Sequence, residues 1–94
     1  MVQIEKQDLL ILRSILEKYP YKFYAYGSRI KGNAKKFSDL DLCIMDNINY
    51  EVLLEIREAL DESDISIHID IKRWNIDMNE HFRSLIKNDL ILFN

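Results

Sequence analysis

The chain has 94 residues, of which 48% are apolar and 11% aromatic, so it is too hydrophobic to be a disordered segment. Its length predicts one domain that spans residues 1–94. Because 16 acidic residues outnumber 13 Lys and Arg, giving a net charge of −3, the composition disfavours a broad basic surface for duplex nucleic acid.

The cysteine and hydropathy patterns bear on the cellular compartment. The single cysteine, Cys43, lies in an apolar run without a partner for an internal disulfide, and we expect a buried, small hydrophobic side chain. No apolar run approaches the ~20 residues of a membrane span, and the first eight residues carry charges where a signal peptide would be apolar. These patterns predict a cytoplasmic protein that does not enter a membrane.

A first amphipathic helix is predicted near the N-terminus. Asp8 is a candidate N-cap, and Tyr19 and Pro20 would close the segment. The apolar residues that recur at helical spacing between them are Leu9, Leu12, Ile15 and Leu16. Residues 21–26 are rich in aromatic side chains and predict a short strand, which ends at Gly27 and leads into a loop that reaches Ser38.

Alternating apolar and polar residues predict two more strands, with a helix between them. Residues 39–46 form the first, with Asp39 and Asp41 pointing to the same side. The helix lies between Asn49 and Asp61. In the second strand, residues 65–72, four isoleucines alternate with polar residues that include His68 and Asp70.

The remaining residues predict a third helix and a short tail. The apolar residues that suggest the helix are Met78, Phe82, Leu85 and Ile86, and residues 90–93 form either an edge strand or a docked tail. This order of elements predicts an α/β (α+β) fold, a small mixed sheet with helices packed on one face. The opposite face would carry Asp39, Asp41 and Asp70.

Three acidic side chains on one face suggest a metal site. Asp39 and Asp41 lie about 6.5–7 Å apart by strand rise, and Asp70 of a neighbouring strand can complete the cluster. Such carboxylates repel one another unless a cation binds. Mg²⁺ prefers one or two carboxylates plus substrate phosphates, and two such ions can stabilise the attacking and leaving oxygens of phosphoryl transfer.

The loop before these carboxylates has features of a phosphate site. Gly27 lets the backbone approach a phosphate, and Ser28 can donate hydrogen bonds to it. The basic residues of the same loop are Arg29, Lys31, Lys35 and Lys36. Each feature also has an ordinary explanation, because a Gly-Ser pair is usually a turn, a Lys-rich loop is usually solvated, and strand-edge Asp residues often cap neighbouring backbone.

Taken together, the motifs are more specific. Gly27 and Ser28, then ten residues, then Asp39-Leu40-Asp41-Leu42, and later Ile69-Asp70-Ile71, resemble the signature of the DNA polymerase β-like nucleotidyltransferase superfamily. The stretch from residue 27 to residue 42 is similar to its minimal nucleotidyltransferase (MNT) branch. The resemblance implies a palm-like nucleotidyltransferase fold that binds Mg²⁺ and ATP.

The resemblance also implies roles for individual residues. Asp39 and Asp41 would bind Mg²⁺, and Asp70 would either assist metal binding or deprotonate the acceptor hydroxyl. The residues implied to bind the nucleotide are Gly27, Ser28, Arg29, Lys31 and Ser38. Lys31 stands where the family often has Arg, and a Lys lacks the bidentate fork of a guanidinium.

Small members of this branch are similar to antitoxins of MNT/HEPN toxin–antitoxin pairs. This implies an all-helical HEPN partner encoded nearby, with a tyrosine that receives AMP from ATP, and a homo- or hetero-oligomer. Because the catalytic sheet and its helices use nearly all of the chain, the acceptor-binding portion is expected from another chain. Two alternatives remain: a non-catalytic module that neutralises a helical partner by occlusion, and a nucleotide sensor without turnover.

Several residues near the predicted site have mainly structural explanations. His68 shares a predicted face with Asp70 but is expected to be a hydrogen-bonded structural residue. Trp74 is expected to be a partly buried rim residue and not a stacking platform for a base. Tyr24 or Tyr26 can line the nucleotide pocket, although sheet packing explains both.

Overall fold

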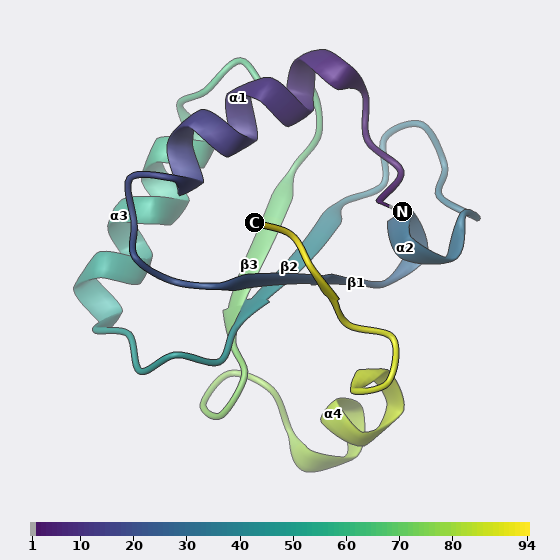
Figure 1. The fold of residues 1–94 in the computed structure, drawn as a ribbon, viewed down its shortest axis with the longest axis vertical. Coiled ribbons are helices and arrows are strands. Elements are labelled where there is room, and N and C mark those ends of the chain that lie inside the picture. The colour runs from purple at the N-terminus through teal and green to yellow at the C-terminus, as the bar shows by residue number, and fades with distance from the viewer. Residues whose placement is uncertain (1) are drawn as a thin grey trace.

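The computed structural model describes residues 2–94, so the first residue of the predicted domain lies outside this range. Four helices and four strands occupy the described part of the chain (Figure 1). In chain order they are α1 (Lys6–Leu16), β1 (Phe23–Tyr26), α2 (Ser28–Lys31), β2 (Leu40–Ile44), α3 (Tyr50–Asp61), β3 (Ile69–Arg73), α4 (Glu80–Ile86) and β4 (Ile91–Leu92). Within residues 2–94, no helix has the length and apolar character that crossing a membrane requires.

The strands form a single mixed sheet in the order β3-β2-β1-β4. β1 runs antiparallel to both β2 and β4, whereas β2 and β3 are parallel. Parallel neighbours need a crossover, and α3 supplies it between β2 and β3. The predicted α/β class with a small mixed sheet is therefore confirmed, and residues 91–92 form the edge strand that was one of two expectations for the tail.

The first face of the sheet is apolar and is covered by α1 and α3. Figure 1 shows these two helices adjacent to one another, at the upper left of the view. The helical side chains buried in this core are Leu12, Leu16, Leu53, Ile56 and Leu60, and the strand side chains are Phe23, Ala25, Leu40, Leu42, Ile44, Ile69 and Ile71. The buried positions agree with the apolar alternation predicted from the sequence, because every second residue of a strand points to the helices.

The second face of the sheet carries a smaller core and is contacted by α4. A small cluster of Tyr26, Cys43 and Met78 is buried there, with Ile86 of α4 packed against it. The sequence predicted that all helices pack on one face, whereas α4 packs on the second face. Phe82 and Leu85 of α4 are exposed and do not form a buried stripe. Cys43 is fully buried, as predicted, and burial raises the pKa of its thiol to about 11.

Two predicted boundaries, the starts of α1 and β3, differ from the structure. Asp8 is not an N-cap, because α1 begins at Lys6 and Asp8 is buried in its first turn. Its carboxylate accepts hydrogen bonds from the backbone N–H and the hydroxyl of Ser66. Ser66 is thereby bonded to the helix, and β3 begins at Ile69 and not at residue 65.

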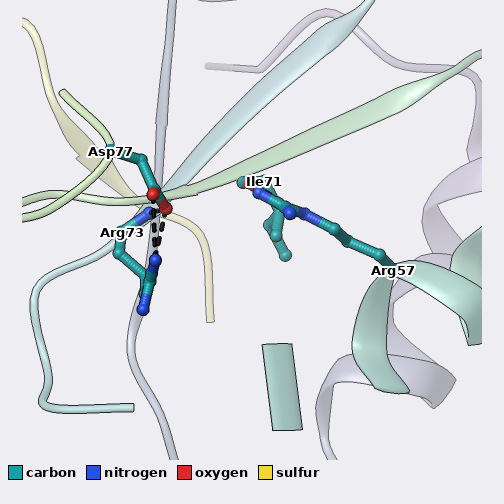
Figure 2. A network of polar contacts seen from close by, with 4 residues as sticks. All are labelled: Arg57, Ile71, Arg73 and Asp77. Carbon is teal, nitrogen blue, oxygen red and sulfur yellow. Dashed lines mark hydrogen bonds and ion pairs between the residues drawn. The ribbon is translucent and has the colours of Figure 1, made fainter. Parts of the chain in front are cut away.

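The outer edge of β3 is protected by Arg57 and Asp77. Arg57 of α3 donates from Nε (3.3 Å) and Nη2 (2.7 Å) to the carbonyl oxygen of Ile71, as Figure 2 shows. The Asp77 carboxylate accepts from the backbone N–H of Arg73 (2.8 Å) and forms an ion pair with its guanidinium, with 3.0 Å between Nε and Oδ2. The Arg73 guanidinium holds the pKa of Asp77 below its usual value. Occupied edge groups discourage another strand from pairing there.

Candidate active site

Three side chains form a row across the second face of the sheet. Asp41 of β2 lies opposite Asp70 in the parallel pairing with β3, and Tyr26 of β1 lies opposite Asp41 in the antiparallel pairing. Residues paired directly across strands point to the same face. The structure therefore brings Asp41 and Asp70 together, and it adds Tyr26, to which the sequence assigned no role in catalysis.

The Asp41 carboxyl group is influenced by the other two predicted carboxylates. Burial, followed by the negative charges of Asp70 and Asp39, raises the pKa of Asp41 from 3.8 to about 6. The positive charges of Lys72 and His68 act in the opposite direction but do not compensate. Asp39 lies just before β2 and is exposed. A bound cation would relieve this repulsion, because it favours the charged form of every carboxylate around it.

The same carboxylates do not enclose a metal ion by themselves. Within residues 2–94, no three His, Cys, Asp or Glu side chains are gathered closely enough to do so. Asp70 forms an ion pair with Lys72, with 3.4 Å between Oδ2 and Nζ. Mg²⁺ usually takes only one or two carboxylates and completes its shell with waters and substrate phosphates. The donor set thus fits a cation that arrives with a phosphate-bearing substrate.

The close approach of Asp41 requires a glycine at residue 27. Its φ of +91° is a conformation that L side chains rarely adopt, and a Cβ at this residue would lie 2.6 Å from Asp41 Oδ2. The Gly27 carbonyl accepts hydrogen bonds from the N–H groups of Ile30 (3.0 Å) and Lys31 (3.3 Å), which starts α2. The strand-to-helix turn therefore packs directly against the carboxylate, and Ser28 is the first residue of α2 beside it.

The Arg29 side chain is held by backbone acceptors. It is 6% exposed, and the guanidinium donates to the carbonyl oxygens of four residues, while its contact with a phosphate stays a prediction. The four acceptors are Gln3, Lys35, Lys36 and Ser38. The Arg29 side chain therefore ties the loop between α2 and β2 to the N-terminal segment. No spacing signal in the sequence marks such a contact, because its acceptors are backbone atoms.

The other predicted nucleotide-binding residues lie around the same loop. The Ser38 hydroxyl donates to the Lys35 carbonyl at 2.9 Å and closes a turn. Lys31 is exposed at the end of α2, as are Lys35 and Lys36 in the loop. The exposed cations thus stand on the segment that connects Gly27 to the acidic strand β2.

Tyr26 is the buried member of the row. Its side chain is 3% exposed, and among residues 2–94 its hydroxyl finds no hydrogen-bond partner. Burial, together with the charges of Asp41 and Asp70, raises the pKa of this phenol. Its ring meets that of Phe82 edge to face, with 5.9 Å between centroids. Only the strand register, which the sequence did not reveal, places this hydroxyl among the carboxylates.

Trp74 and His68 border this region. Trp74 is partly buried and packs against the Tyr26, Cys43 and Met78 cluster, as predicted for a rim residue. His68 is exposed, and its charge acts on Asp41. The His68 carbonyl accepts a hydrogen bond from the Leu40 N–H at 3.0 Å, so its backbone continues the pairing of β2 and β3 by one residue.

Comparisons with known proteins agree with this arrangement. The family model described as "Polymerase beta, Nucleotidyltransferase" matches residues 10–94. The chain is also 37% identical over 90 residues to the "Probable protein adenylyltransferase MntA" of Haemophilus influenzae, an alignment that covers 92% of this chain and 78% of that protein. The resemblance and the enzyme class inferred from the sequence are confirmed: the chain belongs to the polymerase β-type nucleotidyltransferases.

Proposed function

We propose that this nucleotidyltransferase moves AMP from ATP onto a hydroxyl group of a partner protein. The observation that carries the proposal is the pairing of Asp41 with Asp70 directly beside the turn at Gly27. This pairing concentrates negative charge where the chain turns into an exposed basic loop. The relative named as a probable protein adenylyltransferase supports a protein as the acceptor.

Each residue of the site has a proposed part in the reaction. Asp39, Asp41 and Asp70 hold one or two Mg²⁺ ions, and Gly27, Ser28 and Lys31 contact the triphosphate. When bound, the cation supplies charge neutralisation on the phosphates and the departing pyrophosphate. Asp70 either completes the cation site or accepts the proton of the attacking hydroxyl.

The proposed acceptor is a tyrosine of an all-helical HEPN-type toxin encoded nearby, with this chain acting as its antitoxin. The similarity of residues 27–42 to the MNT branch supports this pairing. The net charge of −3 favours a protein partner over duplex nucleic acid. Use of ATP as the donor fits a cytoplasmic location.

Transfer of label from ATP labelled at the α-phosphorus tests the reaction. The protein is incubated with Mg²⁺ and the product of the neighbouring gene, and we expect label on a tyrosine of that partner. Asp41→Asn should lower the rate more than about a hundredfold, because a cation ligand is lost. Asp61→Asn is the matched control, since Asp61 is an exposed carboxylate at the end of α3.

The outcomes separate an enzyme from a binding module. Chelation of the metal should stop labelling, and its return should restore it. Absence of label with every nucleotide and partner tested would contradict the proposed reaction. An Asp41→Asn variant that still neutralises the toxin in cells would show that occlusion, and not transfer, protects the cell.

A further inference from the structure

We propose that Tyr26 is a positioning residue, whose hydroxyl orients the Asp41 carboxylate for binding a cation. This inference rests on the proposed function, because it assigns a support to the same cation site. Three observations carry it: the place of Tyr26 in the row, the state of its hydroxyl, and the packing of its ring.

The strand register places Tyr26 next to the two carboxylates. It lies opposite Asp41, which lies opposite Asp70, so the phenol belongs to the same row and the same face. Both carboxylates act on the phenol electrostatically. Tyr24, two residues earlier on the same face of β1, lies opposite Cys43 instead.

The hydroxyl of Tyr26 is buried without a hydrogen bond within residues 2–94. An unpaired buried hydroxyl lowers stability, and a phenylalanine would avoid that cost. Buried Tyr hydroxyls usually find a partner. The row offers two acceptors, and the nearer in the register is Asp41. An unpaired donor in the same row as a carboxylate can supply the hydrogen bond that fixes the orientation of a metal ligand.

The ring of Tyr26 is fixed from the other side. It contacts Phe82 of α4 edge to face and packs with Cys43 and Met78. The ring of Tyr26 makes these packing contacts, and they do not depend on its hydroxyl. The hydroxyl can therefore be removed by Tyr26→Phe while the packing remains.

Mn²⁺ binding, measured by electron paramagnetic resonance of the free ion, tests the role without relying on turnover. The wild-type protein is compared with Tyr26→Phe, Tyr24→Phe and Asp41→Asn, and the melting temperature of each metal-free protein is recorded. We expect Tyr26→Phe to bind Mn²⁺ roughly tenfold more weakly, as loss of a partner of a metal ligand does. Its metal-free melting temperature should be equal to or above that of the wild type, whereas Tyr24→Phe should bind normally.

The variants distinguish the two proposals. Wild-type binding that Asp41→Asn abolishes and Tyr26→Phe leaves unchanged would overturn the role of Tyr26 and leave the proposed function standing. Absence of Mn²⁺ binding by the wild type without nucleotide would overturn the role of Tyr26 and leave the proposed function standing, because that function needs a cation only together with a phosphate-bearing substrate. Weaker binding by Tyr26→Phe together with a lower melting temperature would indicate a packing role and also overturn the inference.

Discussion

The two faces of the sheet serve different purposes. The first face is sealed by α1 and α3, and its strand residues are almost completely buried. The second face carries Tyr26, Asp41 and Asp70, and none of the residues of α4 beside it is fully buried. Apolar burial is the main favourable contribution to folding, and grouped carboxylates oppose it. The sealed face therefore stabilises a fold whose other face keeps an unfavourable cluster of charge.

Adjacent residues of β2 give the largest test of this comparison. Leu42 points into the sealed core and is 0% exposed, whereas Asp41 points to the second face. Leu42→Ala should lower the free energy of unfolding by about 2–5 kcal/mol, because it leaves a cavity. Asp41→Asn should not lower it, since it removes repulsion. Urea denaturation measures both, and equal destabilisation would contradict a division of labour between the faces.

The two glycines allow a test of intermediate size. Gly27 and Gly32 both have positive φ, but only a Cβ on Gly27 would meet Asp41. Gly32→Ala should lose about 1–2 kcal/mol of stability through left-handed backbone strain, and Gly27→Ala about 1–3 kcal/mol, because its backbone lies in a region that is essentially restricted to glycine. Only Gly27→Ala should also weaken Mn²⁺ binding, because Asp41 must move. Equal Mn²⁺ affinities for the two variants would show that the contact with Gly27 does not hold the carboxylate in place.

The smallest expected effect is in the pH dependence of stability. Because the pKa of Asp41 is raised from 3.8 to about 6, the folded state binds more protons than the unfolded state between these values. The stability that this proton uptake contributes is present below pH 3.8 and is lost as the pH rises through 6. Solvent screening reduces the effect, because Asp41 is only half-buried.

Comparison of the wild type with Asp41→Asn isolates this contribution. Urea denaturation of the metal-free proteins from pH 4 to pH 7 should show the wild type losing stability relative to the variant as the pH rises. Carboxylates remote from Asp41 are common to both proteins, so their contributions cancel. A constant difference between the two would mean that neither burial nor the like charges of Asp70 and Asp39 raise the pKa of Asp41.

Local patterns predicted much of the fold. α3 begins after Asn49, the residue at which the sequence placed the start of this helix, and the Asn49 side chain accepts a hydrogen bond from the Glu51 N–H. The alternation in β2 and β3 correctly separated the core residues from Asp41 and Asp70. Helix α2 was missed because it is a single turn between two glycines of positive φ, too short for any periodicity.

Contacts between distant segments could not be predicted in the same way. Asp8 accepts a hydrogen bond from Ser66, and Arg29 donates one to the carbonyl of Gln3. The sequence shows each charged residue but does not reveal which distant residue it bonds to. The structural role of Arg29 and the link from α1 to Ser66 depend on these contacts. They become visible only when the chain is folded, because neither the Ser66 donors nor the Gln3 carbonyl carries a local sequence signal.

The sequence by itself determined the chemistry of this protein: the residue types, their alternation along the strands and the spacing from Gly27 to Asp41. These are local properties, and they depend on strand geometry and on the preference of hard cations for carboxylates. Only the tertiary structure decided which side chains meet. The register of β1, β2 and β3 placed Tyr26, Asp41 and Asp70 in one row, because pairing between strands is a non-local choice made by the packing of the whole core.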